Sequence, residues 1–123
     1  MVNKLRIDYD VPATMRDGTV LVANVFRPAE EGGYPVALTR TPYGKDFMTG
    51  FPYLDIVRLA KCGYIVVVQD VRGRGGSQGE WELFANEGQD GYDSVEWAAA
   101  LEGSNGNVGM WGFSYLSYTQ WAA

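Results

Sequence analysis

The first part of the chain alternates between apolar and polar residues with the period of a β-strand. Residues 5–11 read Leu-Arg-Ile-Asp-Tyr-Asp-Val, which is the pattern of a strand with one face buried. Arg16-Asp17-Gly18 is a turn signal, and residues 19–26 form a second strand-like segment that ends at Arg27-Pro28. The chain is therefore predicted to open with an antiparallel β-hairpin.

Three later segments have the form of buried strands. These apolar segments, each bounded by turn residues, are 35–39, 64–68 and 108–111. Segments of helical period lie between and after them, and this alternation predicts an α/β fold with a parallel sheet covered on both faces. Right-handed crossovers would bring the carboxyl ends of the strands, and with them Tyr43, Asp70 and Ser114, to one edge of the sheet.

Two helices are predicted between these strands, and a third after Ser114. The first begins near Tyr53 and ends before Gly63, which has the position of a left-handed C-cap. The second runs from Asp90 to about Leu101, with acidic residues in its first turn, where they favour the helix dipole. The inward faces are expected to consist of Tyr53, Ile56, Val57 and Ala60 in the first helix and of Tyr92, Val95 and Ala99 in the second.

Composition narrows the class of protein. A chain of 123 residues with 46% apolar content can bury one core, and a net charge of −5 argues against nucleic-acid or anionic-membrane binding. The N-terminus lacks the apolar segment of a signal peptide, so we expect a soluble, cytoplasmic protein. Histidine is absent and Cys62 is the only cysteine, which removes an internal disulfide and the commonest general base and metal ligand.

Ser114 is the candidate nucleophile. It follows an apolar strand and Gly112-Phe113, and a helix-compatible segment comes directly after it. A strand, a sharp turn and a helix are typical of a nucleophile elbow, whose general pattern is G-x-S-x-G. Gly112 fits that pattern, but Leu116 stands where the second glycine belongs. The alternative is a serine that only caps the following helix.

Tyr43 is the second candidate, because it follows the strand at residues 35–39. Its hydroxyl could stabilise an oxyanion that forms at Ser114. The alternative is an ordinary turn tyrosine after Pro42.

Two glycine-rich stretches suggest phosphate loops, but their spacing is wrong. In residues 70–79, with Gly73 and Gly75 as the first pair, the third glycine should fall at Gln78. Gly44-Lys45-Asp46 lacks the serine or threonine of a P-loop. A nucleotide-binding domain is therefore the least favoured α/β function.

Charged residues near these loops have simpler explanations. We expect Asp70 and Arg72 to pair within their loop. Glu87, Asp90 and Asp93 fit either a site for a hard cation or a solvated helix start, and the helix start is favoured.

Several sequence blocks occur in order along nearly the whole chain. They are Met15-Arg16-Asp17-Gly18, Phe26-Arg27-Pro28, Arg40-Thr41-Pro42-Tyr43, Gln69-Asp70-Val71-Arg72-Gly73, the helix at residues 90–97 and residues 106–123. Taken together, these blocks resemble the CocE/NonD hydrolases, a family of esterases, acylases and Xaa-Pro dipeptidyl-peptidases with the α/β-hydrolase fold.

The elbow of this family reads G-x-S-Y-x-G. Gly112, Ser114 and Tyr115 fit it, Leu116 falls on the variable position, and Ser117 replaces the last glycine at a modest expected local cost. The resemblance implies that Ser114 is the nucleophile and that the Tyr43 hydroxyl and the Tyr115 backbone N–H form the oxyanion hole. It also implies a small-molecule or peptide acyl substrate and no cofactor or metal.

The resemblance further implies that residues 1–123 are the N-terminal part of a catalytic domain. The triad acid and histidine follow the serine along α/β-hydrolase chains, and the nine residues after Ser114 contain neither. Further strands, a helical cap and a C-terminal jelly-roll-like domain would lie outside these residues. We therefore expect residues 1–123 alone to be inactive and the strand before Ser114 to form a sheet edge.

Two questions stay open at this stage. The alternative function is a hydrolase-like fold that binds a ligand without turnover. The oligomeric state is also open, with a homo-oligomer among the alternatives.

Overall fold

The predicted hairpin is present and forms one side of a larger sheet, but Ile7 and Tyr9, expected on its buried face, are exposed, and the strand register shifts between Asp8 and Val11. In the computed structural model of the protein, which describes residues 1–50 and 55–123, β1 (Leu5–Thr14) and β2 (Val20–Pro28) pair antiparallel. The turn between them is closed by a hydrogen bond from the Met15 N–H to the Thr19 carbonyl, at 2.8 Å. β2 then pairs antiparallel with a strand far along the chain, β4 (Ile65–Asp70).

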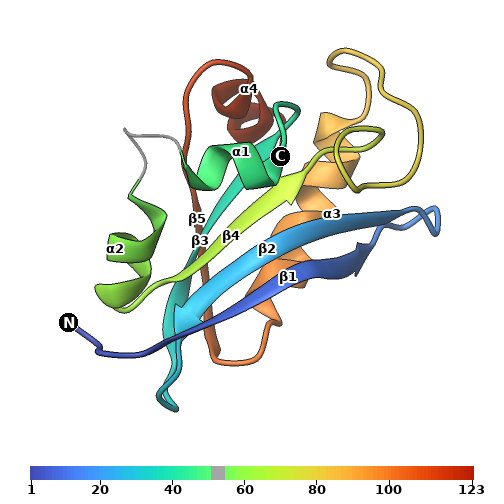
Figure 1. The fold of residues 1–123 in the computed structure, drawn as a ribbon. Coiled ribbons are helices and arrows are strands. Elements are labelled where there is room, and N and C mark those ends of the chain that lie inside the picture. Colours follow the sequence, from blue (N-terminus) through green and yellow to red (C-terminus); the bar gives the residue numbers. More distant parts are fainter. Residues whose placement is uncertain (51–54) are drawn as a thin grey trace.

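The other strands of this sheet are parallel, as predicted. β3 (Tyr34–Thr41) pairs with β4 on one side and with β5 (Ser104–Met110) on the other. The strand order is β1-β2-β4-β3-β5 (Figure 1). All six residues of β4 are buried, which explains why its first four residues, Ile65 to Val68, are apolar without alternation. β5 lies at the edge of the described sheet, as expected.

Four helices occur in the described residues, one more than the pattern predicted. They are α1 (Lys45–Thr49), α2 (Ile56–Lys61), α3 (Glu87–Ala99) and α4 (Tyr115–Ala122). α1 was not predicted, because five residues are too few to show a helical period. Gly63 ends α2 with a φ of 94°, as predicted, whereas Val57 is exposed rather than inward. Tyr53, the predicted first inward residue of that helix, lies outside the described residues.

The helices cover both faces of the sheet (Figure 1). On one face, Ile65 and Val67 of β4 belong to a core cluster that includes Ala98 of α3. On the other face, Val66 and Val68 belong to a second cluster. The helix residues of the second cluster are Met48 of α1, Ile56 and Ala60 of α2, and Leu116 of α4. The two-sided cover predicted from the alternation of strands and helices is confirmed. In residues 1–50 and 55–123, no helix has both the length and the apolar character needed to cross a membrane.

The predicted inward face of α3 was right for Val95, which packs against the core cluster of Ile65 and Val67, but wrong for Tyr92. Tyr92 is 57% exposed, whereas Glu87, Asp90 and Ser94 are buried together with Ala98. The helix starts at Glu87 rather than Asp90, and its first two turns bury carboxylates that pair with arginines. A search for an apolar stripe overlooks such a face, because it assumes that charged residues point to solvent.

Candidate active site

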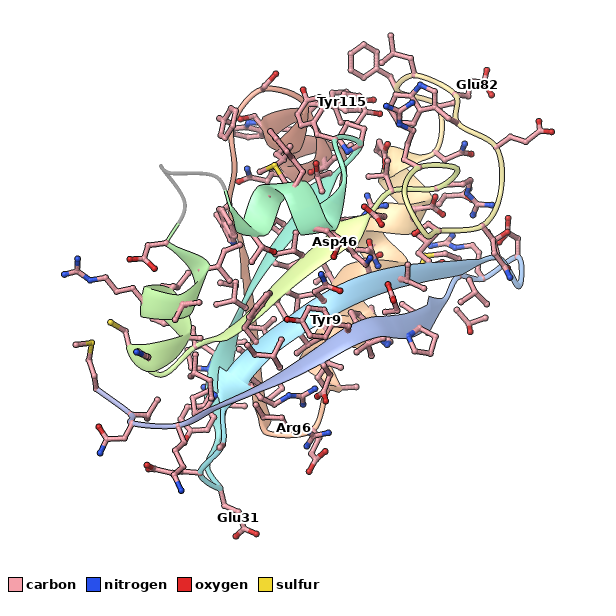
Figure 2. The ribbon with its side chains drawn as sticks, viewed as in Figure 1. Arg6, Tyr9, Glu31, Asp46, Glu82 and Tyr115 are labelled. Carbon is pink, nitrogen blue, oxygen red and sulfur yellow. The ribbon has the colours of Figure 1, made fainter. Side chains whose placement is uncertain are left out.

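The three predicted site residues meet at the carboxyl end of the parallel strands. The Tyr43 hydroxyl lies 3.0 Å from the Ser114 Oγ, and either atom can be the donor. The Tyr115 backbone N–H donates to the Tyr43 hydroxyl oxygen at 3.4 Å. In Figure 2, Tyr115 lies at the end of the molecule opposite to Glu31, which is in the loop before β3. The topology thus brings together residues about 70 positions apart, at the predicted edge.

Ser114 has a strained backbone at a sharp strand-to-helix turn. Its φ and ψ are 56° and −130°, a conformation that residues other than glycine rarely adopt. Such strain costs roughly 1–3 kcal/mol and is concentrated at functional sites. Ser114 holds the N-cap position of α4, but its side chain makes no capping hydrogen bond. The exposed hydroxyl faces Tyr43 instead, so the helix-capping alternative is not supported.

The turn closes only because residue 112 has no side chain. Gly112 has a φ of 133°, and a Cβ there would lie 2.5 Å from the Leu116 Cβ and 3.0 Å from the Thr39 Oγ1. Ser117, which departs from the resembled pattern, fits this turn: its hydroxyl donates to the Gly112 carbonyl at 3.1 Å. Gln120 donates to the same carbonyl at 3.2 Å.

The Gly112→Ala substitution is expected to destabilise the protein by about 1–3 kcal/mol, the usual cost of overpacking a filled site. Gly109→Ala, on β5, is the matched control, because a Cβ at Gly109 would meet no described residue within 4 Å. It should change the free energy of unfolding by less than about 0.5 kcal/mol. Urea unfolding followed by tryptophan fluorescence measures both variants. Equal free energies of unfolding of the two variants would contradict the close packing around residue 112.

The loop that carries Tyr43 is held from both sides. The Lys45 N–H donates to the Asp70 carboxylate at 2.8 Å, and the Arg74 Nε donates to the Pro42 carbonyl at 3.0 Å. Asp70 is itself buried at the end of β4. The position of the Tyr43 hydroxyl therefore depends on β4 and its following loop as well as on β3.

Lys45 is occupied by carboxylates, which agrees with the failed P-loop spacing. Its Nζ lies 2.7 Å from Asp10 and 3.6 Å from both Asp46 and Asp70. Burial lowers the pKa of Lys45, but the hydrogen bond to Asp10 and the charges of Asp70 and Asp46 outweigh burial and raise it overall. This lysine therefore stays charged and is committed to the fold.

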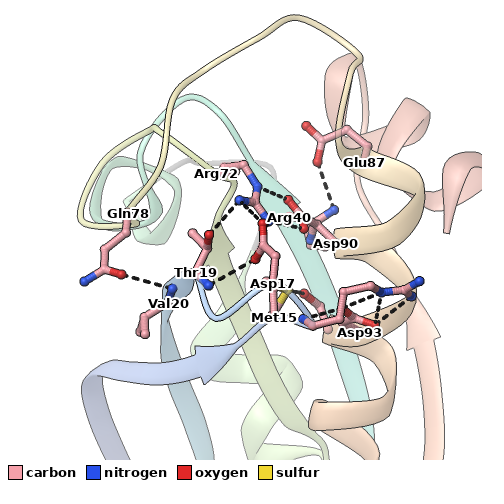
Figure 3. Close-up of polar contacts among 12 residues, drawn as sticks. Met15, Asp17, Thr19, Val20, Arg40, Arg72, Gln78, Glu87, Asp90 and Asp93 are labelled. Atoms are coloured by element: carbon pink, nitrogen blue, oxygen red, sulfur yellow. Dashed lines mark hydrogen bonds and ion pairs between the residues drawn. The ribbon is translucent and has the colours of Figure 1, made fainter.

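The predicted pairing of Asp70 with Arg72 was wrong. The Arg72 guanidinium instead binds Asp90 and Asp17, each at 2.8 Å (Figure 3). These hydrogen bonds, first to Asp90 and then to Asp17, raise the pKa of Arg72. Asp70 accepts from backbone N–H groups, among them that of Gly76 at 3.0 Å. The two neighbours in sequence thus serve different contacts, because the Arg72 side chain extends toward the start of α3.

The three carboxylates near the start of α3 each bind an arginine. The pairs are Glu87–Arg40 at 3.0 Å, Asp90–Arg72 at 2.8 Å and Asp93–Arg16 at 2.8 Å. Within residues 1–50 and 55–123 no group of three or more acidic, histidine or cysteine side chains is arranged to hold a metal ion. The carboxylates join the helix to the sheet and its loops, so the solvated helix start that the sequence favoured was wrong for Glu87 and Asp90.

The Arg40–Glu87 pair was not singled out from the sequence. Arg40 is fully buried, Glu87 is almost so, and the Glu87 carboxylate also accepts from the Tyr115 hydroxyl at 2.7 Å. Burial lowers the pKa of Arg40 against the opposing charge of Glu87. Burial, followed by the hydrogen bond to Glu87, raises the pKa of Tyr115, so the phenol remains a donor. The available signal was an arginine at the end of a strand with buried apolar residues before it, because unpaired arginines are almost never buried.

An aromatic cluster surrounds the Tyr115 ring. Phe84 stacks on it with ring centroids 5.3 Å apart, and Trp81 lies at the same distance with a tilted ring. The Phe84 N–H donates to the Tyr115 hydroxyl at 3.2 Å, and Tyr118 donates to the Phe84 carbonyl at 3.1 Å. The segment before α3 is thereby fastened to α4 beside Ser114.

Comparison with known proteins identifies relatives of this chain. Residues 17–123 match the family described as X-Pro dipeptidyl-peptidase (S15 family). The chain is 38% identical over 116 residues to the cocaine esterase of Rhodococcus sp. (strain MB1 Bresler), a match that covers 93% of this chain and 20% of that protein. The chain therefore spans about a fifth of the length of this curated relative.

Solved structures share the fold, and two of them match nearly the whole chain. One is an α-amino acid ester hydrolase, with a TM-score of 0.83 and 30% identity over 95% of this chain and 22% of that chain. The other is a CocE/NonD family hydrolase from Staphylococcus aureus, with a TM-score of 0.87 and 32% identity over 98% of this chain and 25% of that chain. The mixed sheet and its helices match the N-terminal part of these α/β-hydrolase-like structures. The predicted resemblance and fold class are confirmed.

Proposed function

The chain belongs to the X-Pro dipeptidyl-peptidase (S15) family, and we propose that the whole protein is a serine hydrolase of acyl esters or amides. Its relatives are hydrolases by name, an esterase and an ester hydrolase among them. The observation that carries the proposal is the strained Ser114, whose uncapped hydroxyl lies 3.0 Å from the Tyr43 hydroxyl. The turn at Gly112-Phe113-Ser114 is then a nucleophile elbow.

In the proposed reaction the Ser114 Oγ attacks the acyl carbonyl carbon. A histidine from the rest of the protein takes the serine proton and passes it to the leaving alcohol or amine as the C–O or C–N bond breaks. Water then attacks the acyl-serine ester, releasing the carboxylic acid and restoring Ser114. Residues 1–123 contain no histidine, so they supply the nucleophile but not its base.

The oxyanion of the tetrahedral intermediate would be stabilised by the Tyr43 hydroxyl and the Tyr115 N–H. The two groups lie 3.4 Å apart, a separation that lets both approach one oxygen at about 2.7–3.1 Å, the distance that such donors need. The same oxygen would be two bonds from the Ser114 Oγ, which itself lies beside Tyr43. The nucleophile and both donors thus surround one reacting carbonyl.

The substrate class follows from what the relatives' names have in common. Cocaine esterase, α-amino acid ester hydrolase and X-Pro dipeptidyl-peptidase all imply attack on an acyl carbonyl with an alcohol or amine leaving group. We therefore extend to this protein a small-molecule or peptide acyl substrate.

The proposal is tested by trapping the acyl-enzyme in the whole protein. Mixing with a p-nitrophenyl ester should give a burst of about one nitrophenolate per protein, because acyl-enzyme accumulation produces burst kinetics. Mass spectrometry of a peptide containing Ser114 should show the added mass of one acyl group. Binding of the ester without a burst or an added mass would contradict the proposal and support the binding-only alternative.

A further inference from the structure

Tyr115 makes one contact through its backbone N–H and another through its side-chain phenol. Its backbone N–H lies at the proposed oxyanion position, next to the Tyr43 hydroxyl. Its side chain is buried and its phenol donates to the Glu87 Oε2 at 2.7 Å. This residue therefore connects the reacting centre at the surface with a charged pair inside the protein.

The inner anchor is built from several elements. Glu87 begins α3, and its other carboxylate oxygen accepts from the Arg40 Nη1 at 3.0 Å. The Arg40 Nε donates to the Gln69 Oε1 at 2.7 Å, and Ser94 donates to the same oxygen at 2.9 Å. The sheet strands β3 and β4 thereby fix the carboxylate that receives the Tyr115 phenol. Figure 3 shows Arg40 and Glu87 facing one another between β3 and α3.

Such a pair is a costly way to gain stability alone. Removing two charges from water is only partly repaid by their attraction, and apolar residues of similar size often stabilise a core as well or better. Among the described residues, the Arg40 Nη2 also has no hydrogen-bond partner. The pair does, however, fix the direction in which the Tyr115 side chain points, because the ionised Glu87 carboxylate accepts a short hydrogen bond from the phenol.

A fixed orientation of the Tyr115 side chain matters because of the strained backbone at Ser114. Its φ of 56° is strained, and strain of this kind persists only where the surroundings enforce it. The peptide group between Ser114 and Tyr115 carries the proposed oxyanion donor, so relaxation of Ser114 would rotate that N–H. A Tyr115 side chain fixed at its far end, through the phenol, resists this rotation.

We infer that Glu87, held by Arg40, is a positioning residue that fixes the Tyr115 phenol and thereby aims the Tyr115 N–H at the substrate oxyanion. This role rests on the proposed serine hydrolase function. It acts through Tyr115 and needs no contact between Glu87 and substrate. It explains why an ion pair is buried directly behind the turn that carries Ser114.

The test is the Tyr115→Phe variant of the whole protein, measured with a boronic acid. Boronic acids form a tetrahedral adduct with an active-site serine and place an oxygen in the oxyanion hole. The variant keeps the backbone N–H but loses the anchor, and misplacement by about 1 Å can cost on the order of 100-fold. We expect boronate affinity and kcat to fall about 10- to 100-fold, with KM changed less than about twofold, since a ground-state contact is not removed.

Tyr118→Phe is the matched control. Its hydroxyl donates to the Phe84 carbonyl at 3.1 Å and so also fastens α4 to the segment before α3. Tyr118→Phe should leave boronate affinity and kcat within about twofold of wild type, because it removes no proposed contact with the transition state. If both variants match wild type, the positioning role is wrong while the proposed function stands. If wild type neither binds the boronate nor becomes acylated, the proposed function itself is wrong.

A double-mutant cycle with Glu87→Gln assigns the effect to Glu87. Glutamine keeps an oxygen acceptor but removes the charge, so Glu87→Gln should weaken boronate binding less than Tyr115→Phe does. Residues in one hydrogen-bond network are not additive, so Tyr115→Phe should cost less in the Glu87→Gln background than in wild type. Equal costs in both backgrounds would show that the Tyr115 phenol acts independently of Glu87 and would overturn the inference.

Discussion

Replacing Ser114 with alanine in the whole protein is expected to lower kcat by about 10⁶-fold, as loss of a serine nucleophile does in other hydrolases. The reason is that no other group of the described site can form the acyl bond. The neighbouring hydroxyl of Tyr43 is proposed to donate to the oxyanion, and Ser117 uses its hydroxyl on the Gly112 carbonyl. The loss of kcat is measured as the rate of ester hydrolysis at saturating substrate for wild type and Ser114→Ala, each after subtraction of the uncatalysed rate.

The control for this substitution is Ser104→Ala, at the other end of β5. The Ser104 hydroxyl accepts a hydrogen bond from the Gly106 N–H at 3.0 Å and is remote in the strand from the turn at Ser114. A fluorophosphonate probe should label wild type and Ser104→Ala at a single site and leave Ser114→Ala unlabelled. Single-site labelling that survives in a folded Ser114→Ala protein would assign the nucleophile to another residue.

Local patterns were sufficient to predict much of the fold. The alternation at residues 5–11 and the turn after it predicted the hairpin, because each depends only on neighbouring residues, but the alternation did not predict that Ile7 and Tyr9 are exposed. The order of strands in the sheet was not accessible in the same way. β2 joins β4, and β3 lies between β4 and β5. Those pairings are contacts between distant segments and leave no mark on the period of any one segment.

In the candidate site, too, local patterns were predicted and contacts between distant residues were missed. Ser114 and Tyr43 were found because a glycine, a serine and the strands before them form recognisable local patterns, and the parallel topology then predicted their meeting. The Arg40–Glu87 pair and the buried carboxylates on the inward face of α3 were missed. Polar residues are assigned to the surface unless a partner is known, and the partner of Glu87 is 47 residues away. Asp70 and Arg72 show the reverse error, since proximity in sequence suggested a pairing that the loop geometry prevents.

Replacing Tyr43 with phenylalanine in the whole protein is expected to lower kcat by about 10²–10³-fold, the cost of removing one oxyanion-hole donor. KM should change little, because the hydroxyl is proposed to act on the charge that develops in the transition state rather than on the bound substrate. The ring should remain in place, since the loop is held by contacts of Lys45 with Asp70 and of Arg74 with Pro42. Steady-state kinetics with an ester substrate separate the two constants.

Tyr34→Phe is the control that separates an effect at the candidate site from a general effect of losing a tyrosine hydroxyl near β3. Tyr34 begins β3, whereas Tyr43 follows its end, and the Tyr34 hydroxyl donates to the Glu30 carbonyl at 3.2 Å. Both substitutions remove one phenolic hydroxyl near the same strand, but only the Tyr43 hydroxyl lies beside Ser114. A kcat for Tyr43→Phe equal to that of Tyr34→Phe would remove Tyr43 from the mechanism. A selective loss at Tyr43 would instead support the hydroxyl and the Tyr115 N–H as a pair of donors, since the two lie 3.4 Å apart and address one oxygen.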